Sequence, residues 1–268
     1  MKLFEGRVSV TYEDLLVEVD GGIQVVRLNR PEVLNAMREK TFLELEAVLD
    51  AANDEKVGVL IITGSGDRAF SAGGDVKSLE KMTSGDAISF ARLAHRVLGK
   101  IEGLPKPIIA AVNGLALGAG CDLAIACDLC VASRKAAFGE PPTGLGITTP
   151  FGGTQRLPRI IGPKRAKHLF FTGDTIDADT ALQLGLVNMV VEHERLMDEA
   201  KNLVKRILAR APIAVGYCKA LVNKSIGGNI EEGDDMEMEL YARCFDTEDK
   251  REGTRAFLEK RKPLFRGR

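Results

Sequence analysis

The sequence lacks any excess of charge of one sign and any long apolar run. Its 37 Lys and Arg residues nearly balance its 38 Asp and Glu residues, for a formal net charge of −1 at pH 7. The chain also lacks a basic run and stacking aromatic side chains. We therefore expect neither a nucleic acid nor a membrane surface as a partner. No apolar stretch approaches the roughly 20 residues that span a bilayer.

The sequence also lacks a secretion signal and a clear set of paired cysteines. Residues 1–7 contain neither the apolar centre of a secretory signal nor an Arg- and Ser-rich transit pattern. The five cysteines are odd in number, which together with the missing signal predicts reduced thiols in a cytoplasmic protein. Cys127 and Cys130 form a CxxC pair, but no second pair follows at zinc-site spacing. We expect two core thiols there and no metal site.

The chain does have enough apolar sequence for a core and an unusual amount of glycine. Of 268 residues, 45% are hydrophobic and 28% are charged, which is typical of a globular protein of one to three domains. Glycine contributes 28 residues, about a tenth of the chain against an average of roughly 7%. Tight backbone turns are therefore expected to matter.

The first two thirds of the chain alternate between strand patterns and helix patterns. Residues 15–19 and 23–28 alternate in period two around a glycine turn, which predicts a hairpin. The other predicted segments are buried strands at 57–63, 108–112 and 129–132, with helices at 39–49 and 88–101. Strands that alternate with helices in this way indicate an α/β core.

From about residue 195 the strand signals disappear. Four successive segments show helical periodicity, at 194–209, 213–225, 231–245 and 247–260. A helical tail of this size would leave an apolar patch exposed on a single chain, which soluble monomers rarely tolerate. We therefore predict two parts: residues 1–194 form an α/β core with the active site, and residues 195–268 form a helical tail for oligomerisation.

Glycine is concentrated in three segments, 64–75, 113–122 and 144–154, each beside a predicted strand. The middle segment has a Gly-x-Gly before a helix, as dinucleotide-binding loops do. However, position 123 is Leu where that fingerprint needs a third glycine, and no acidic residue ends a second strand about 20 residues later. The first segment does not fit a phosphate-binding loop either. Nucleotide binding is therefore disfavoured.

A different chemistry fits two of these loops together. Backbone N–H groups beside small residues can converge on one oxygen and stabilise the negative charge that develops there. Ala119 would begin a helix over 120–127, whose N-terminus adds a favourable dipole. Asp122 follows by nearly one turn and can face the same pocket. An oxyanion hole beside one acid–base group suits enolate chemistry. In the alternative interpretation, the glycines only permit close packing and Asp122 caps the helix.

Six motifs follow one another along nearly the whole chain. They are LNRP with LNAM at 28–37, AFSAGGD at 69–75, KPI to GAG at 106–120, FGEP at 138–141, GGTQRL at 152–157 and FLEKRKP at 257–263. In this order they resemble the crotonase family, also called the enoyl-CoA hydratase/isomerase superfamily. The resemblance implies a spiral of ββα turns with a helical C-terminal region that builds a homotrimer or a dimer of trimers.

The resemblance also implies roles for individual residues. The backbone N–H groups of Gly74 and Ala119 match the two donors of the family's oxyanion hole. Positions that match the path of CoA, including tail residues that reach it across a subunit boundary, are Ala36, Ala72, Asp75, Val76, Lys77, Pro142, Phe257 and Lys260. In the alternative interpretation, Phe257 and Lys260 belong to a charged helix face with one core aromatic. CoA would enter only as part of the substrate thioester, with no permanently bound cofactor.

The sequence departs from the family at the catalytic acids. Two glutamates flank the substrate's Cα–Cβ bond in hydratases. The first matches Asp122, which is one methylene shorter, and the second matches Pro142, which has no acid. Three explanations stay open: Glu140 reaches the pocket, Asp122 works alone, or the reaction is not simple hydration. We predict an acyl-CoA enzyme that stabilises a thioester enolate, with hydration of a linear or cyclic enoyl-CoA favoured.

The alternatives to hydration are a decarboxylase, an isomerase or a ring-opening hydrolase of the same superfamily, or a CoA-binding member without catalysis. Retention of Gly74, Ala119 and Asp122 together argues against loss of catalysis. Two further polar residues are expected to act structurally. We expect Asp75 to anchor its turn by accepting backbone hydrogen bonds, and Arg156 to satisfy a buried carbonyl or a carboxylate.

Overall fold

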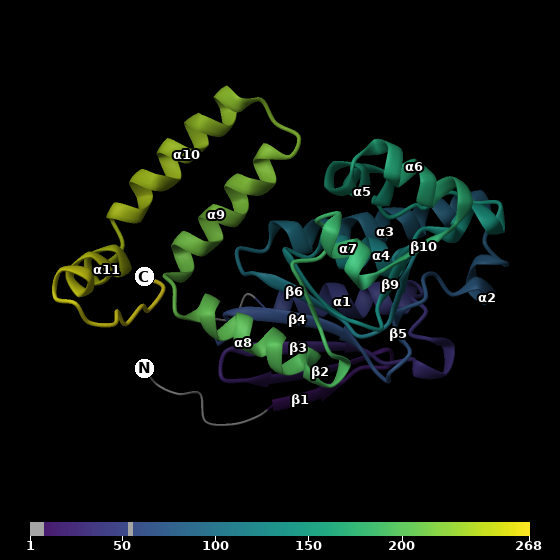
Figure 1. Cartoon of the computed structure of the whole chain (residues 1–268), viewed down its shortest axis with the longest axis horizontal. Helices are drawn as coiled ribbons and strands as arrows, with labels where there is room; N and C mark the ends of the chain where they lie inside the picture. Colours follow the sequence, from purple (N-terminus) through teal and green to yellow (C-terminus); the bar gives the residue numbers. More distant parts are fainter. Residues whose placement is uncertain (1–7, 53–55) are drawn as a thin grey trace.

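The computed structural model describes residues 8–52 and 56–268, which form two sheets with helices around them (Figure 1). The larger sheet has the strand order β1-β2-β3-β4-β6-β8-β11, and the smaller has the order β10-β9-β7-β5. The strands are β1 (Val8–Thr11), β2 (Leu15–Asp20), β3 (Ile23–Leu28), β4 (Val59–Gly64), β5 (Ala69–Ser71), β6 (Ile108–Val112), β7 (Leu115–Leu117), β8 (Leu129–Ser133), β9 (Ala137–Gly139), β10 (Thr175–Asp177) and β11 (Met189–Val191).

The helices connect and cover these strands. The α-helices are α1 (Glu39–Ala51), α2 (Val76–Leu79), α3 (Ser84–Gly103), α4 (Ala119–Ala126), α5 (Gly153–Ile161), α6 (Pro163–Thr172), α7 (Ala178–Gln183), α8 (Leu196–Leu208), α9 (Pro212–Ser225), α10 (Ile230–Phe245) and α11 (Glu248–Leu258). The 3-10 helices are η1 (Pro31–Val33), η2 (Pro141–Leu145) and η3 (His193–Arg195). In the described part of the chain, no helix is long and apolar enough to cross a membrane.

The chain repeats one unit, in which a strand of the larger sheet is followed by a strand of the smaller sheet and then by helix. The pairs β4 and β5, β6 and β7, and β8 and β9 each follow this rule. Within each sheet, each strand of one repeat lies parallel to the corresponding strand of the next repeat and is hydrogen-bonded to it. This arrangement is the spiral of ββα turns that the motifs predict. It brings the loops after β5, β7 and β9 to one side of the smaller sheet.

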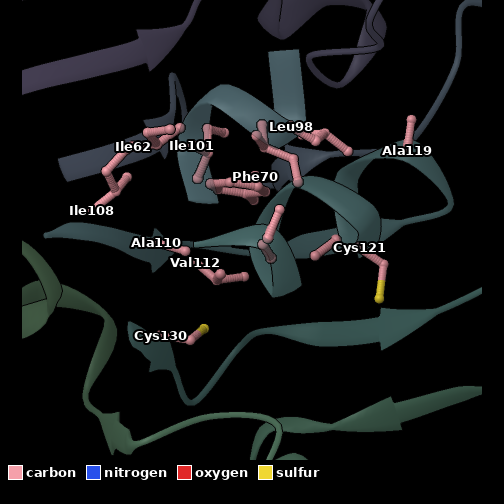
Figure 2. Packing of buried hydrophobic residues seen from close by; sticks show 14 of the residues in the cluster. Ile62, Phe70, Leu98, Ile101, Ile108, Ala110, Val112, Ala119, Cys121 and Cys130 are labelled. Carbon is pink, nitrogen blue, oxygen red and sulfur yellow. The ribbon is translucent and has the colours of Figure 1, made fainter. Parts of the chain in front are cut away.

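The larger sheet is covered on both faces, which explains the continuous apolar runs of β4 and β6. On one face, Ile62 and Ile108 pack with helix residues such as Leu98 and Ile101. Figure 2 shows Phe70 of β5 between these helix side chains and the sheet. On the other face, alternate residues of the same strands pack against α8. A strand buried on both faces has no polar side to alternate with.

The C-terminal helices divide into one that packs on the sheet and three that project. Helix α8 lies on the larger sheet, whereas α9, α10 and α11 extend away from the core (Figure 1). The boundary between core and tail at residue 195 stays a prediction.

Helix α9 is attached to the core by Lys219, whose side chain is buried. Its Nζ lies 2.8 Å from Oδ2 of Asp128 and donates to the backbone carbonyls of Ile101 and Lys106.

Replacing Lys219 is expected to detach α9 from the core. In Lys219→Met, the carboxylate of Asp128, which is 18% exposed, loses its cation. Breaking one side of a fully buried pair costs about 3–5 kcal/mol, so we expect a loss toward the lower end of that range. Lys224→Met is the matched control, because Lys224 pairs with Glu232 at the surface, where such pairs contribute about 0–1 kcal/mol. Urea unfolding of both variants measures the difference. Equal losses of stability in the two variants would contradict the anchoring role of Lys219.

Candidate active site

The loop after β5 presents the backbone N–H of Gly74. The N–H of Met37 donates to the carbonyl of Gly73 at 2.8 Å, and the N–H of Asp75 donates to the carbonyl of Met37 at 2.9 Å. The N–H of Gly74 lies between these two bonds and has no acceptor within the described residues. Gly73 has a φ of 112°, which favours glycine. A fixed backbone with a free donor therefore follows β5.

Asp75 holds this loop in place, as its expected structural role requires. Its carboxylate accepts from the N–H groups of Lys77 and Ser78 and so caps α2. Nη1 of Arg30 lies 2.9 Å from Oδ2 of Asp75. Burial acts to raise the pKa of Asp75, but the hydrogen bond and the charge of Arg30 outweigh it and leave the pKa lowered. Asp75 is therefore an ionised anchor of the turn, and its contact with CoA stays a prediction.

The loop after β7 lies against the first loop. Ala119 is the first residue of α4, so its N–H is among the free donors of the first helical turn. A Cβ atom at Gly73 would lie 3.0 Å from the carbonyl oxygen of Leu117 and 3.8 Å from the nitrogen of Ala119. The loops that carry Gly74 and Ala119 are thus adjacent, as an oxyanion hole requires.

Close packing of the two loops depends on Gly120. A Cβ atom there would lie 2.2 Å from the carbonyl oxygen of Ser71. Gly120→Ala should therefore push the start of α4 away, with a stability loss of about 1–3 kcal/mol from overpacking and a fall in turnover. Gly99→Ala is the control, since a Cβ atom meets nothing within 4 Å there and alanine favours a helix interior by about 0.5–1 kcal/mol. Thermal unfolding and activity of both variants test this. An active, stable Gly120→Ala protein would contradict it.

Two fully buried carboxyl groups lie behind these loops. Asp122 is on α4, and Glu140 follows β9. The hydroxyl of Thr149 donates to Oδ2 of Asp122 at 2.9 Å. A Cβ atom at Gly153 would lie 2.2 Å from Oδ1 of Asp122 and 3.2 Å from Oε1 of Glu140. Both carboxyl groups therefore face the same point, at the start of α5.

The surroundings of this pair favour a shared proton. Within the described residues, Oδ1 of Asp122 and both oxygens of Glu140 have no hydrogen-bond partner. Burial raises the pKa of Asp122, while the hydroxyl of Thr149 and the charge of Arg156 oppose that shift. Burial also raises the pKa of Glu140, and the nearby charge of Asp122 raises it further. Two carboxyl groups in one buried space do not both ionise readily, so the pair retains a proton near neutral pH.

Pro142 occupies the position of the second family glutamate but has no carboxyl group, so it can affect only the shape of the site. It lies in η2, and its Cγ would be 3.5 Å from a Cβ atom at Gly118. The prolines at 141 and 142 begin η2 directly after Glu140. The side chain of Glu140 is fully buried, whereas Pro142 is half-buried. Of the three explanations for the missing family acid, this geometry favours the first, in which Glu140 reaches the pocket.

The remaining predicted CoA-binding residues fall into two groups. Ala36, Ala72, Val76 and Lys77 surround the first loop, where Arg30 donates to the carbonyl of Ala36 and Ala72 donates to the carbonyl of Leu34. The structure brings this group together beside Gly74. The second group is Phe257 and Lys260. Phe257 is 83% exposed, and α11 lies at the opposite end of the molecule from α2 (Figure 1). These two residues are far from the site of their own chain.

Several residues of the site gave no functional signal in the sequence. Thr149 lies in an irregular segment, and Gly153 stands in a motif but has no polar side chain. Their role emerges only when α5 packs on α4. Arg156 meets the expectation of a structural role, because it pairs with Glu102 and donates to the carbonyl of Phe151. Among the described residues, no group of three or more His, Cys, Asp or Glu side chains is placed to hold a metal ion.

Comparisons with known proteins agree on one family. The chain is 45% identical over 257 residues to crotonyl-CoA hydratase of Syntrophomonas wolfei, covering 96% of this chain and 99% of that protein. It is 43% identical over 250 residues to short-chain-enoyl-CoA hydratase of Clostridium acetobutylicum, covering 93% and 96% respectively. A crystal structure of enoyl-CoA hydratase from Bacillus anthracis matches with a TM-score of 0.89 and 35% identity, covering 98% of this chain and 100% of that chain.

A family model for enoyl-CoA hydratase/isomerase matches residues 18–268. This match includes each of the six motifs and both loops of the site, so the resemblance seen in the sequence is confirmed. The chain belongs to the enoyl-CoA hydratase/isomerase family.

Proposed function

We propose that this protein is an enoyl-CoA hydratase, which adds water reversibly to the double bond of a short-chain enoyl-CoA thioester. The observation that carries this proposal is the pair of buried carboxyl groups, Asp122 and Glu140, which face one point behind two adjacent loops. Hydration needs one group that accepts a proton from water and one that donates a proton to the other carbon. The names of the two relatives, crotonyl-CoA hydratase and short-chain-enoyl-CoA hydratase, support a short acyl group.

In this proposal the N–H groups of Gly74 and Ala119 bind the thioester oxygen. They stabilise the negative charge that forms on it as water attacks C3. Asp122 acts as the base, because Thr149 and Arg156 favour its charged form. Glu140 acts as the acid, because the charge of Asp122 disfavours its ionisation. Asp122 gains a proton from water while Glu140 gives one to C2, so the pair again holds one proton after each turnover.

CoA enters this reaction as part of the substrate, and we propose no permanently bound cofactor. The group around the first loop, Ala36, Ala72, Asp75, Val76 and Lys77, would line the path of the thioester and its pantetheine arm. Pro142 would shape the pocket beside the second loop. We place the enzyme in the cytoplasm, which the five free cysteines of the chain support. Residues 1–194 would hold the site and residues 195–268 the assembly surface.

We propose a homotrimer or a dimer of trimers. The exposed apolar side chains of the projecting helices and the C-terminal segment support this assembly: Ile230, Met238, Tyr241, Phe257, Leu258 and Leu264. In such an assembly, Phe257 and Lys260 of one protomer could reach the CoA of a neighbour. Light scattering should give three or six times the chain mass of 29.0 kDa. A mass of one chain at micromolar concentration would contradict this assembly.

A panel of CoA thioesters tests the proposed reaction. The purified protein is incubated with crotonyl-CoA, a cyclic enoyl-CoA and malonyl-CoA, and the products are read by mass spectrometry. We expect a gain of one water on crotonyl-CoA. Loss of carbon dioxide or ring opening, without hydration of any enoyl thioester, would replace hydration by another reaction of the family. Calorimetry with acetoacetyl-CoA measures binding separately, and no binding at ~1 mM would contradict an acyl-CoA site with a typical KM.

A further inference from the structure

A segment between η2 and α5 supplies much of the environment of Asp122. The hydroxyl of Thr149 donates to its carboxylate. A Cβ atom at Gly153 would lie 2.2 Å from Oδ1 of Asp122. The backbone N–H groups of Gly153 and Phe151 act to lower the pKa of Asp122, though burial dominates and leaves that pKa raised. The base of the proposed reaction therefore depends on how this segment is held.

Arg156 holds the segment from α5. Its Nη1 donates to the carbonyl of Phe151 at 3.1 Å. The guanidinium passes close over Gly152, where a Cβ atom would lie 2.1 Å from Nη1, and Gly152 has a φ of 101°. Only glycine combines that backbone conformation with room for the side chain of Arg156. The arginine is thus built into the rear wall of the site.

Glu102 fixes Arg156 from the other side. The Nε of Arg156 donates to Oε1 of Glu102 at 2.6 Å, and Nη2 donates to Oε2 at 2.9 Å. Two parallel bonds of this kind fix the plane of the guanidinium as well as its position. Glu102 lies in the last turn of α3, and its backbone carbonyl accepts from Asn223 of α9 at 2.9 Å. The end of α3 that carries Glu102 is therefore itself tied down.

We propose that Arg156 is a positioning residue for the acid–base pair and that Glu102 both orients it and moderates its charge. The proposal rests on the proposed hydration. Arg156 supplies two effects through one side chain: it holds the carbonyl of Phe151, and its charge favours the ionised form of Asp122. Glu102 opposes the second effect, because its negative charge offsets that of Arg156.

Other titratable groups around Asp122 must be separated from this effect. Glu140 and the thiol of Cys121 face the same buried space. His95 of α3 lies behind Gly152, where its Cε1 would be 3.6 Å from a Cβ atom at that glycine. The test therefore changes Arg156 and Glu102 and leaves Glu140, Cys121 and His95 in place.

The two substitutions should move the pH dependence in opposite directions. Arg156→Gln removes a positive charge that lowers the pKa of Asp122. The apparent pKa of the acid limb in the pH profile of kcat/KM for crotonyl-CoA should therefore rise by about 1 pH unit. Turnover should also fall, by about tenfold, because the Phe151 carbonyl is no longer held. Glu102→Gln leaves the charge of Arg156 without its partner, so the acid limb should move to lower pH.

Arg96→Gln is the matched control, because Arg96 makes the same two-bond pair with Glu46 on the outer side of α3 and α1. It should leave the profile unchanged. An unchanged pH profile in Arg156→Gln, or shifts in the same direction in Arg156→Gln and Glu102→Gln, would overturn the proposal.

Two further cases keep the proposal testable. If Arg156→Gln does not fold, Glu102→Gln alone must still lower the apparent pKa of the acid limb. If the wild type hydrates no enoyl-CoA, the proposed function fails, and infrared titration of the buried carboxyl groups in the same variants still tests the role of Arg156.

Discussion

Asp122→Asn is expected to lower turnover of crotonyl-CoA by ~10²-fold or more while leaving acyl-CoA affinity nearly unchanged. The substitution removes one general acid–base group, and such groups contribute typically 10²–10⁴-fold. The amide keeps the shape of the side chain and can still accept from Thr149, so the loops that bind the thioester should stay in place. Steady-state rates and calorimetry with acetoacetyl-CoA separate the two effects.

The control for this experiment is a carboxylate that only caps a helix. Asp177 directly precedes α7, and its side chain accepts from the N–H of Thr180 as the N-cap of that helix. Asparagine caps a helix about as well as aspartate, so Asp177→Asn should change neither turnover nor stability. If Asp122→Asn behaves like this control on each substrate found, Asp122 is a helix cap and its catalytic assignment is wrong.

Glu140→Gln is expected to abolish most activity and to stabilise the fold. Turnover should fall ~10²–10⁴-fold through loss of the acid. Burial holds the pKa of Glu140 above its ordinary value, so the folded state binds a proton that the unfolded state has released. The stability of the wild type therefore decreases as pH rises from the unfolded pKa through the folded pKa. The side chain of glutamine is neutral at each pH, so the variant should not show this decrease in stability at alkaline pH.

Melting temperatures from pH 5 to pH 10 measure the stability effect. The gap between Glu140→Gln and the wild type should widen toward alkaline pH, by about 2–4 °C for each kcal/mol regained in a protein of this size. Asp122→Asn provides the comparison, since it removes the other member of the pair and should also favour the folded state at high pH. A Glu140→Gln protein that melts below the wild type at pH 9 would show that the buried carboxylate stabilises the fold.

Much of the fold could be predicted from local patterns. The buried strands β4, β6 and β8 and the helices α1, α3 and α8 to α11 are long enough to show a period or an apolar run. The hairpin of β2 and β3 follows its glycine turn and is confirmed. The four strands of the smaller sheet, β5, β7, β9 and β10, have three residues each. Three residues show no period, so these strands are defined only by pairing with one another.

The residues of the candidate site also divide into some that the sequence predicts and some that only the folded structure reveals. Gly74, Ala119 and Asp122 could be predicted, because motif order and helix spacing place them in two loops and one helical turn. The inward direction of Glu140 could not, because it depends on the turn at Pro141 and on the space that Gly153 leaves free. The pair of Arg156 with Glu102 joins residues of α5 and α3 that are far apart in sequence, and only the folding of both helices around α4 brings them together.

The central claim is that Asp122 and Glu140 hold one proton between them at neutral pH and use it for hydration. Infrared spectroscopy of the protein measures this proton directly, because a protonated carboxyl group and a carboxylate absorb at different frequencies. The spectrum of the wild type minus that of Glu140→Gln at pH 7 should contain the band of a protonated carboxyl group, and the band should vanish at alkaline pH. A difference spectrum with only carboxylate bands at pH 7 would contradict the claim.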